Sequence, residues 1–244
     1  MFYQLYEMNH AALQPARALA DATRIFYSNP LNPIAHTTWG RSVAAMAELF
    51  ERTTRRYGKP AFGLDATTVD GKTVPVAQKT VWSRPFCNLL HFERALPAGR
   101  QADQRLLIVA PMSGHYATLL RGTVEAMLPH ADVYITDWVD ARMVPMTEGR
   151  FDLDDYIDYV IAMLHKLGPD THVMAVCQPS VPVLAAVALM EARGDRFAPA
   201  TMTLMGGPID TRSHPTAVNV LAKEKGTQWF RDNVIMPAPW PVPG

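Results

Sequence analysis

The sequence predicts an α/β fold with a mostly parallel sheet flanked by helices, and three observations lead to this prediction. Short, continuously apolar runs occur at residues 106–110, 132–136, 172–176 and 201–205. Segments with helical periodicity follow the first three of these runs. Uninterrupted apolar strands that alternate with helices are typical of a parallel sheet covered on both faces.

The first part of the chain, residues 1–62, is predicted to be a helical extension. Apolar residues recur at helical spacing until Pro30 and Pro33 interrupt the pattern. Thr37 and Thr38 then offer an N-cap for a second amphipathic helix that ends before Gly58. The extension precedes a core predicted over residues 63–244.

The core begins with β-type sequence and continues into the alternating pattern. Thr67–Val69 and Thr73–Val76 flank Asp70-Gly71, which predicts a hairpin, and Phe86–Phe92 is a plausible further strand. By analogy, an antiparallel hairpin ahead of parallel strands is what the sheet of an α/β-hydrolase has. Asp152 is read as the N-cap of a later helix.

The composition narrows the possible functions. The 23 basic and 23 acidic residues balance, so the charge gives no sign of a nucleic-acid partner. No apolar run reaches the roughly 18 residues needed to span a bilayer, and residues 1–10 do not resemble a secretory signal. The cysteines Cys87 and Cys177 are therefore expected as free thiols in a soluble, cytoplasmic protein. No pair of histidines has metal-ligand spacing near a carboxylate or thiol, no Gly-rich phosphate loop is present, and no cofactor is expected.

Ligands of open α/β sheets bind beyond the carboxyl ends of the strands, and Cys177 follows the third run directly. A nucleophile at a sharp strand-to-helix turn is exposed, and the N–H of the next residue, here Gln178, can hold an oxyanion. The following helix N-terminus favours a thiolate. The usual elbow has glycine two positions before and after the nucleophile, where this chain has Ala175 and Pro179. From spacing alone, a buried cysteine acting as a small apolar residue remains equally open.

The loop after the first run supplies the second oxyanion donor in hydrolases of this fold. Met112 and Ser113 are the candidates for that donor. His115 lies on the wrong loop for the triad base of this fold, so lining the site or satisfying a hydrogen bond is the favoured role. Asp137 and Trp138 follow the second run and Asp210 the fourth, and all three are possible lining residues. For Asp137, an ion pair with Arg142 is the favoured interpretation, and a role in orienting loops near the site is the alternative.

Several motifs taken together resemble the intracellular polyhydroxyalkanoate (polyhydroxybutyrate) depolymerases. The similar segments are residues 3–8, 109–124, 135–138 and the Val-Cys-Gln-Pro element at 176–179. The resemblance implies that Cys177 is the nucleophile and that the substrate is the amorphous polyester of intracellular storage granules. It implies the polymer and the granule surface as partners, and it leaves the oligomeric state open.

Members of that family continue well past the segment that ends here at Gly244. The resemblance therefore implies that the last strands of the sheet, with the triad acid and base, are missing. A lid is expected to begin at about residue 211, and His214, in the loop that opens it, is not expected to be the base. Two alternatives stay open: a truncated, non-catalytic granule-associated fragment, and a polyhydroxyalkanoate synthase-like acyltransferase, against which Ala175 and Pro179 argue.

Overall fold

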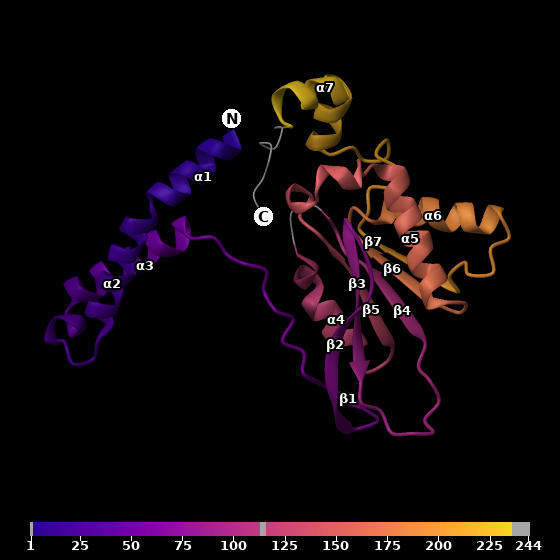
Figure 1. The fold of residues 1–244 in the computed structure, drawn as a ribbon, viewed down its shortest axis with the longest axis horizontal. Helices are drawn as coiled ribbons and strands as arrows, with labels where there is room; N and C mark the ends of the chain where they lie inside the picture. Colours follow the sequence, from indigo (N-terminus) through magenta and orange to yellow (C-terminus); the bar gives the residue numbers. More distant parts are fainter. Residues whose placement is uncertain (1, 113–115, 236–244) are drawn as a thin grey trace. The chain divides into compact units, whose positions relative to one another are not determined.

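The computed structural model describes residues 2–112 and 116–235, and its contacts divide the chain into two units. One unit holds the residues up to Gly58 together with those from Lys225 onward. The other unit, Lys59–Glu224, contains the whole sheet and every described residue of the predicted site. Figure 1 shows the helices and strands of both units.

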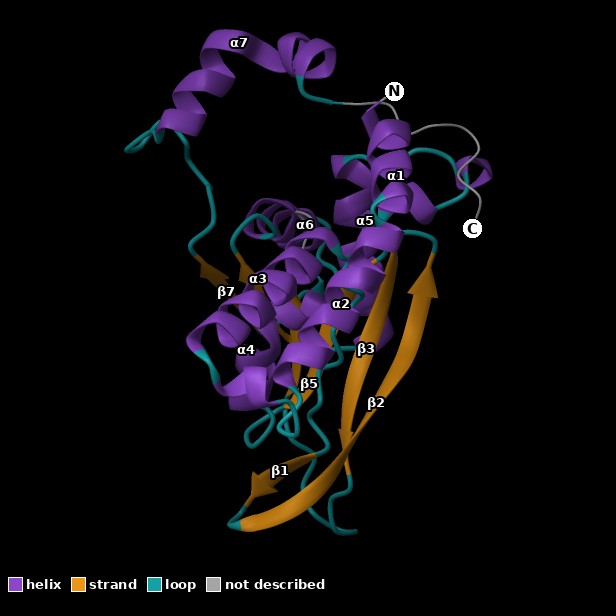
Figure 2. Ribbon diagram, turned by 90° about the vertical axis from the view of Figure 1, so that its left-hand side faces the viewer, coloured by secondary structure: helices purple, strands orange, loops and turns teal. Residues whose placement is uncertain are grey.

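The helices predicted from the N-terminal periodicity are present. They are α1 (Phe2–Ala12), α2 (Gln14–Ser28), the 3-10 turn η1 (Pro33–His36) and α3 (Thr38–Thr54). Thr37 is the N-cap of α3, as expected, because its hydroxyl accepts a hydrogen bond from the Gly40 N–H at 3.0 Å. Helices α2 and α3 lie side by side, as both ribbon views show (Figure 2).

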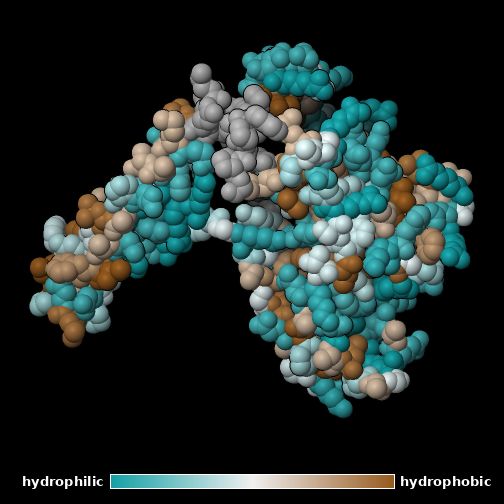
Figure 3. Space-filling model, in the orientation of Figure 1, coloured by the Kyte–Doolittle hydropathy of each residue, from teal (hydrophilic) through white to brown (hydrophobic). Residues whose placement is uncertain are grey.

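The helices of this unit carry many exposed apolar side chains. Leu31 is 90% exposed and Trp39 is 60% exposed, and α2 has no buried residue. The space-filling view shows brown, apolar side chains gathered around the end of α2 (Figure 3). These helices are therefore amphipathic, with an apolar side that their mutual packing leaves uncovered.

The sheet has seven strands in the order β1-β2-β3-β5-β4-β6-β7. Antiparallel pairing joins β1 to β2, β2 to β3 and β3 to β5, and the remaining neighbours are parallel. An antiparallel start, followed by parallel strands with a crossover between β4 and β5, is the α/β-hydrolase arrangement. The predicted fold class is confirmed. The strands are β1 (Ala66–Val69), β2 (Lys72–Arg84), β3 (Cys87–Arg94), β4 (Arg105–Val109), β5 (Asp132–Trp138), β6 (His172–Val176) and β7 (Thr201–Met205).

Alternate residues of the strands feed two separate cores, one on each face of the sheet. On β4, Leu107 and Val109 pack with α5 (Leu153–Leu167) and α6 (Ser180–Ala192), whereas Leu106 and Ile108 face the other way. That second face is covered by η2 (Ala117–Leu120) and α4 (Arg121–Met127). Burial on both faces explains why most residues of the central parallel strands are apolar.

Local signals in the sequence placed most of these elements correctly. Asp70 and Gly71 have φ of 50° and 75°, the left-handed pair that a two-residue hairpin turn requires. Asp152 caps α5 in a capping box with Asp155, in which each side chain accepts from the other's backbone N–H. The predicted hairpin strand at Thr73–Val76 is only the beginning of β2, which continues to Arg84.

The sheet ends at β7, which pairs only with β6 among the described residues. Its residues alternate between exposed and half-buried, so β7 is the least buried of the parallel strands. Helix α7 (Ala217–Asn233) follows and is kinked at Gly226, where φ is 70°. Within the described residues, no helix is long and apolar enough to cross a membrane.

Candidate active site

Cys177 lies at a sharp turn between β6, which ends at Val176, and α6, which begins at Ser180. Its φ is 66°, in the left-handed region that non-glycine residues rarely adopt. The side chain is exposed, so Cys177 is not the buried, core-filling cysteine of the alternative interpretation. A strained, exposed residue at the carboxyl end of a central strand has the geometry of a nucleophile elbow.

Hydrogen bonds on both sides of the turn hold Cys177 in this conformation. Its N–H donates to the carbonyl of Met205, the last residue of β7, at 2.7 Å. Its carbonyl accepts from the Ser180 N–H at 3.1 Å, which closes the turn into α6. The two backbone polar groups of Cys177 are therefore both used, and the thiol is left pointing away from the backbone ladder.

Gly207, two residues past β7, packs against the elbow from the neighbouring strand. A Cβ added at Gly207 would lie 2.1 Å from the Ser180 side chain and 2.9 Å from the Cys177 carbonyl oxygen. Elbows usually obtain close packing from glycines flanking the nucleophile, but here Ala175 and Pro179 occupy those positions and both are buried. The close approach is supplied instead by Gly207, a residue that the sequence pattern did not single out.

The loop after β4 reaches the elbow through a proposed oxyanion donor. The Met112 N–H donates to the side-chain oxygen of Gln178 at 3.4 Å, a long and weak hydrogen bond. Two of the residues proposed from the sequence for the oxyanion hole therefore lie next to each other. Ser113 and His115 fall outside the described residues.

The sequence predicted that Asp137 and Trp138 follow a strand that ends at residue 136. In the structure they are instead the last two residues of β5. Asp137 is 4% exposed and forms an ion pair with Lys59, 78 positions earlier in the chain. Its second carboxylate oxygen has no hydrogen-bond partner among the residues that the structure describes. Asp137 is thus paired with Lys59, a residue that no signal in the sequence indicated. The side chain of Arg142, the expected partner, lies outside the described part of the structure.

Trp138 and its neighbour Thr136 contact the backbone where β4 ends. The Thr136 hydroxyl accepts from the Ala110 N–H at 2.8 Å, and the Trp138 indole N–H donates to the Ala110 carbonyl at 2.8 Å. Thr136 is fully buried. It was missed in the sequence because a threonine inside an apolar run reads as an ordinary strand residue.

Asp210 is exposed and lies in the loop after β7. Arg212 donates to both of its carboxylate oxygens, at 2.9 and 3.0 Å, and these hydrogen bonds hold the pKa of Asp210 below its usual value. The Asp210 carboxylate is therefore bound by Arg212 from the same loop. It makes no hydrogen bond to Cys177 in the described part of the chain.

The second cysteine contrasts with Cys177 in its exposure. Cys87 is fully buried at the start of β3. Burial raises the pKa of the Cys87 thiol well above its usual value, which keeps the sulfur neutral. A buried, protonated thiol is a poor nucleophile, so Cys177 is the cysteine available for chemistry.

Within residues 2–112 and 116–235, no histidine or carboxylate forms a hydrogen bond with the Cys177 thiol. His214 lies in an exposed loop with φ of 52°, and its ring contacts the hydroxyl of Ser213 at 3.2 Å. The same described residues contain no group of three or more His, Cys, Asp or Glu side chains that could hold a metal ion.

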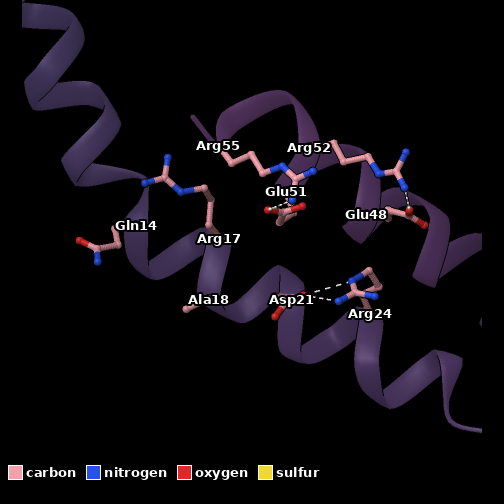
Figure 4. Close-up of a pocket in the computed structure, with 9 residues that line it drawn as sticks. All are labelled: Gln14, Arg17, Ala18, Asp21, Arg24, Glu48, Glu51, Arg52 and Arg55. Carbon is pink, nitrogen blue, oxygen red and sulfur yellow. Dashed lines mark hydrogen bonds and ion pairs between the residues drawn. The ribbon is translucent and has the colours of Figure 1, made fainter. Parts of the chain in front are cut away.

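A cavity of about 610 Å³ lies in the other unit, between α2 and α3. Figure 4 shows three ion pairs in its lining: Arg24 with Asp21, Arg52 with Glu48, and Arg55 with Glu51. The remaining charged residue, Arg17, donates to the backbone carbonyls of Thr54 and His10. None of the residues proposed for the site lines this cavity. The pairing leaves little unbalanced charge, which is typical of a solvated seam between two helices.

The order of the strands, with helices on both faces and an elbow at the carboxyl end of β6, defines the class of the protein as an α/β-hydrolase. Within that class, residues 206–244 match the family model described as "PHB de-polymerase C-terminus". The match confirms the resemblance to the polyhydroxybutyrate depolymerases that the motifs in the sequence indicated. No curated protein shows a significant sequence match to the chain.

Among solved structures, the chain is similar to a putative lipase from Acinetobacter baumannii, with 13% identity, coverage of 62% of this chain and 48% of that chain, and a TM-score of 0.42. It is also similar to naproxen esterase from Bacillus subtilis, with 11% identity, coverage of 53% and 42%, and a TM-score of 0.37. A putative esterase from Staphylococcus aureus gives 12% identity, coverage of 78% and 60%, and a TM-score of 0.43. The chain therefore spans between 42% and 60% of the length of these three structures.

Proposed function

We propose that the chain belongs to a carboxylic-ester hydrolase that cleaves polyhydroxybutyrate in intracellular granules, with Cys177 as its nucleophile. The observation that carries the proposal is the conformation of Cys177, an exposed thiol held at a φ of 66° between a parallel strand and a helix. Cys177 follows the last residue of β6, at the carboxyl end of the strand, and ligands of α/β folds bind at that end, which supports the proposal. The family match at residues 206–244 supports the polyester as the substrate.

The proposed chemistry is an acyl transfer in two steps. The Cys177 sulfur attacks the ester carbonyl, and the carbonyl electrons move onto the oxygen to give a tetrahedral oxyanion. When this collapses, the carbon–oxygen bond of the ester breaks, the hydroxyl end of the polymer leaves with a proton, and a thioester remains on Cys177. Water then attacks the thioester, releasing a free carboxylic acid and restoring the thiol.

Two backbone N–H groups are proposed to hold the oxyanion, those of Gln178 and Met112. The first follows the nucleophile directly, and the second is close enough to contact the Gln178 side chain at 3.4 Å. Such donors commonly contribute a factor of about 10² to 10³ to kcat each. Ser113 remains the other candidate for the second donor.

The test is the release of hydroxybutyrate from amorphous granules by the unaltered chain and by Cys177→Ala and Cys177→Ser. We expect Cys177→Ala to abolish release, because the attacking atom is lost, and Cys177→Ser to retain at most a small fraction. Iodoacetamide should modify Cys177 and spare buried Cys87, which provides an internal control for folding. Unchanged release by Cys177→Ala would refute the proposal.

A second candidate function is suggested by the lack of a base hydrogen-bonded to Cys177 in the described residues. The chain by itself would then be a non-catalytic protein that associates with the granule, since loss of a general base removes a large factor in rate. Co-sedimentation with granules without any release of hydroxybutyrate would support this function. Release by the purified 244-residue chain alone would exclude it.

A further inference from the structure

The backbone hydrogen bonds of β4 change partner where the strand ends. Its pairing with β5 runs as far as Ile108 opposite Ile135, and its pairing with β6 as far as Val109 opposite Ala175. Ala110 comes next and is fully buried. A buried backbone needs partners for both its N–H and its carbonyl, so Ala110 must find them outside the ladder.

Both partners are side chains from β5, two residues apart on that strand. Thr136 accepts from the Ala110 N–H and Trp138 donates to the Ala110 carbonyl, each at 2.8 Å. Residues at positions i and i+2 of a strand project from the same face, so the two side chains grip Ala110 together. We call this pair the Ala110 clamp.

The clamp itself is held rigidly. The Trp138 ring is edge-on to Tyr156, with ring centroids 4.4 Å apart, and also contacts Phe151 at 5.8 Å. Thr136 is fully buried and lies in the paired part of β5, opposite Leu89 of β3. Neither side chain can move without disturbing the packing around it.

The segment beyond the clamp leads directly to the proposed oxyanion donor. Pro111 is buried, has no N–H and has a fixed φ, so it passes on the direction set at Ala110. The next N–H along the chain is that of Met112, which points to the Gln178 side chain beside the elbow. The Met112 N–H is two residues from Ala110, whose backbone is fixed, and Pro111 lies between them. The direction of this N–H therefore has little freedom to change.

We propose that Thr136 and Trp138 are positioning residues, which clamp Ala110 and thereby aim the Met112 N–H at the oxyanion formed on Cys177. The inference rests on the proposed function, because it assigns these side chains a role in that reaction. It predicts that removing the clamp weakens the stabilisation of the tetrahedral oxyanion and leaves other reactions of Cys177 unchanged. The reason is that an oxyanion donor is effective only when it is fixed at the place where charge develops.

The experiment uses the full chain and two variants. Thr136→Val removes the hydroxyl with little change of shape, and Trp138→Phe removes the indole N–H together with one of the two rings. A short alkyl trifluoromethyl ketone is the probe, because attack by the Cys177 sulfur on its carbonyl gives a stable adduct with the oxyanion and no leaving group. Fluorine NMR reports both the affinity of the adduct and the pH at which its oxygen ionises. Iodoacetamide alkylation of Cys177, which forms no oxyanion, is measured in parallel.

Matched controls lie elsewhere in the same unit. Thr171→Val removes a fully buried hydroxyl that donates to the Gly168 carbonyl at 2.9 Å, just before β6 and at the opposite end of the sheet from the elbow. Trp82→Phe trims a tryptophan that packs on Tyr159 with ring centroids 5.5 Å apart. Thr171→Val loses a buried hydroxyl and its hydrogen bond, and Trp82→Phe loses part of a packed tryptophan ring. The two hydrogen bonds to Ala110 come from Thr136 and Trp138 and are kept in both controls.

We expect each clamp variant to weaken the adduct by about tenfold to a hundredfold and to raise the pH of its ionisation, with alkylation unchanged. If granule hydrolysis occurs, kcat should fall by a similar factor at an unchanged KM. Adduct affinities equal to those of the control variants would overturn the inference, as would the absence of any adduct on the unaltered chain. If the unaltered chain forms the adduct and the clamp variants weaken it, but no hydroxybutyrate is released, the proposed granule hydrolysis by this chain is refuted and the clamp stays supported.

Discussion

Replacing Gly207 by alanine would place a methyl group where the elbow and the exit of β7 touch. The added Cβ would lie 2.1 Å from the Ser180 side chain, well below the distance that real Cβ contacts show. Ser180 is fully buried and cannot swing into solvent, and the second contact, at 2.9 Å, is with the backbone carbonyl of Cys177. Either the start of α6 or the segment after β7 must therefore shift.

The cost of such a shift can be estimated. Forcing an extra methyl group into a well-packed site costs about 1–3 kcal/mol, and the short contact with Ser180 places Gly207→Ala in the upper half of that range. Backbone strain adds nothing, because φ at Gly207 is outside the left-handed region. We therefore expect the free energy of unfolding to fall by about 2–3 kcal/mol.

The assay is urea denaturation, in which a lower midpoint at an unchanged m-value reports a loss of stability. Gly122→Ala is the matched control, since a Cβ there has nothing within 4 Å and alanine favours a helix. The double variant with Ser180→Gly should lose less stability than the two single changes added together, because the Ser180 atoms in the clash are gone. A midpoint for Gly207→Ala equal to that of the unaltered protein would refute the reasoning.

Two further predictions concern stability. Asp152→Ala removes the N-cap of α5 and its capping box with Asp155, and should lower the free energy of unfolding by about 1 kcal/mol in thermal or urea denaturation. Asp103 is bound by Arg100 at 2.6 Å and by buried Arg94 at 2.8 Å, and these cations hold its pKa below 3.8. Asp103→Asn should therefore cost about 1–2 kcal/mol at neutral pH, and the difference should vanish as the pH falls through the lowered pKa, because the unaltered side chain is then protonated too.

Each of these predictions has a control. Asp158→Ala lies on the exposed side of the same helix as the Asp152 cap and should leave stability unchanged or raise it slightly. If it costs as much as Asp152→Ala, the cap is not the cause. For Asp103→Asn, a loss of stability that does not diminish as the pH falls would show that the ion pair does not explain it.

The parallel half of the fold could be predicted because its strands are buried on both faces. Such strands are mostly apolar, and the predicted run 106–110 covers the four buried residues of β4. Two other predicted runs coincide with β6 and β7, although β7 is exposed or half-buried along its length. The far part of β2 was not predicted, because residues 77–84 are mostly exposed. That part of β2 is held by backbone pairing with β3 rather than by burial, and pairing leaves no pattern in the sequence.

The residues of the candidate site also fall into two groups. Some can be predicted from the sequence around them, and others are defined only by tertiary contacts. Cys177 was recognisable because the strand, the turn and the helix around it are contiguous in sequence. Gly207, Thr136 and Lys59 were not, since each acts on a residue at least 26 positions away. Lys59 shows the limit most clearly, because its partner Asp137 is 78 positions away and nothing near it in sequence suggests an ion pair.

The hydrogen bond from the Cys177 N–H to Met205 links the proposed nucleophile to the outermost strand of the described sheet. Edge strands open more readily than central strands, so amide exchange at Cys177 should follow the local opening of β7 rather than global unfolding. The local stability of the turn at Cys177 is then that of the edge strand β7 and not that of the central strands. Whatever pairs with or covers β7 in the cell would determine how long the thiol keeps its strained, reactive geometry.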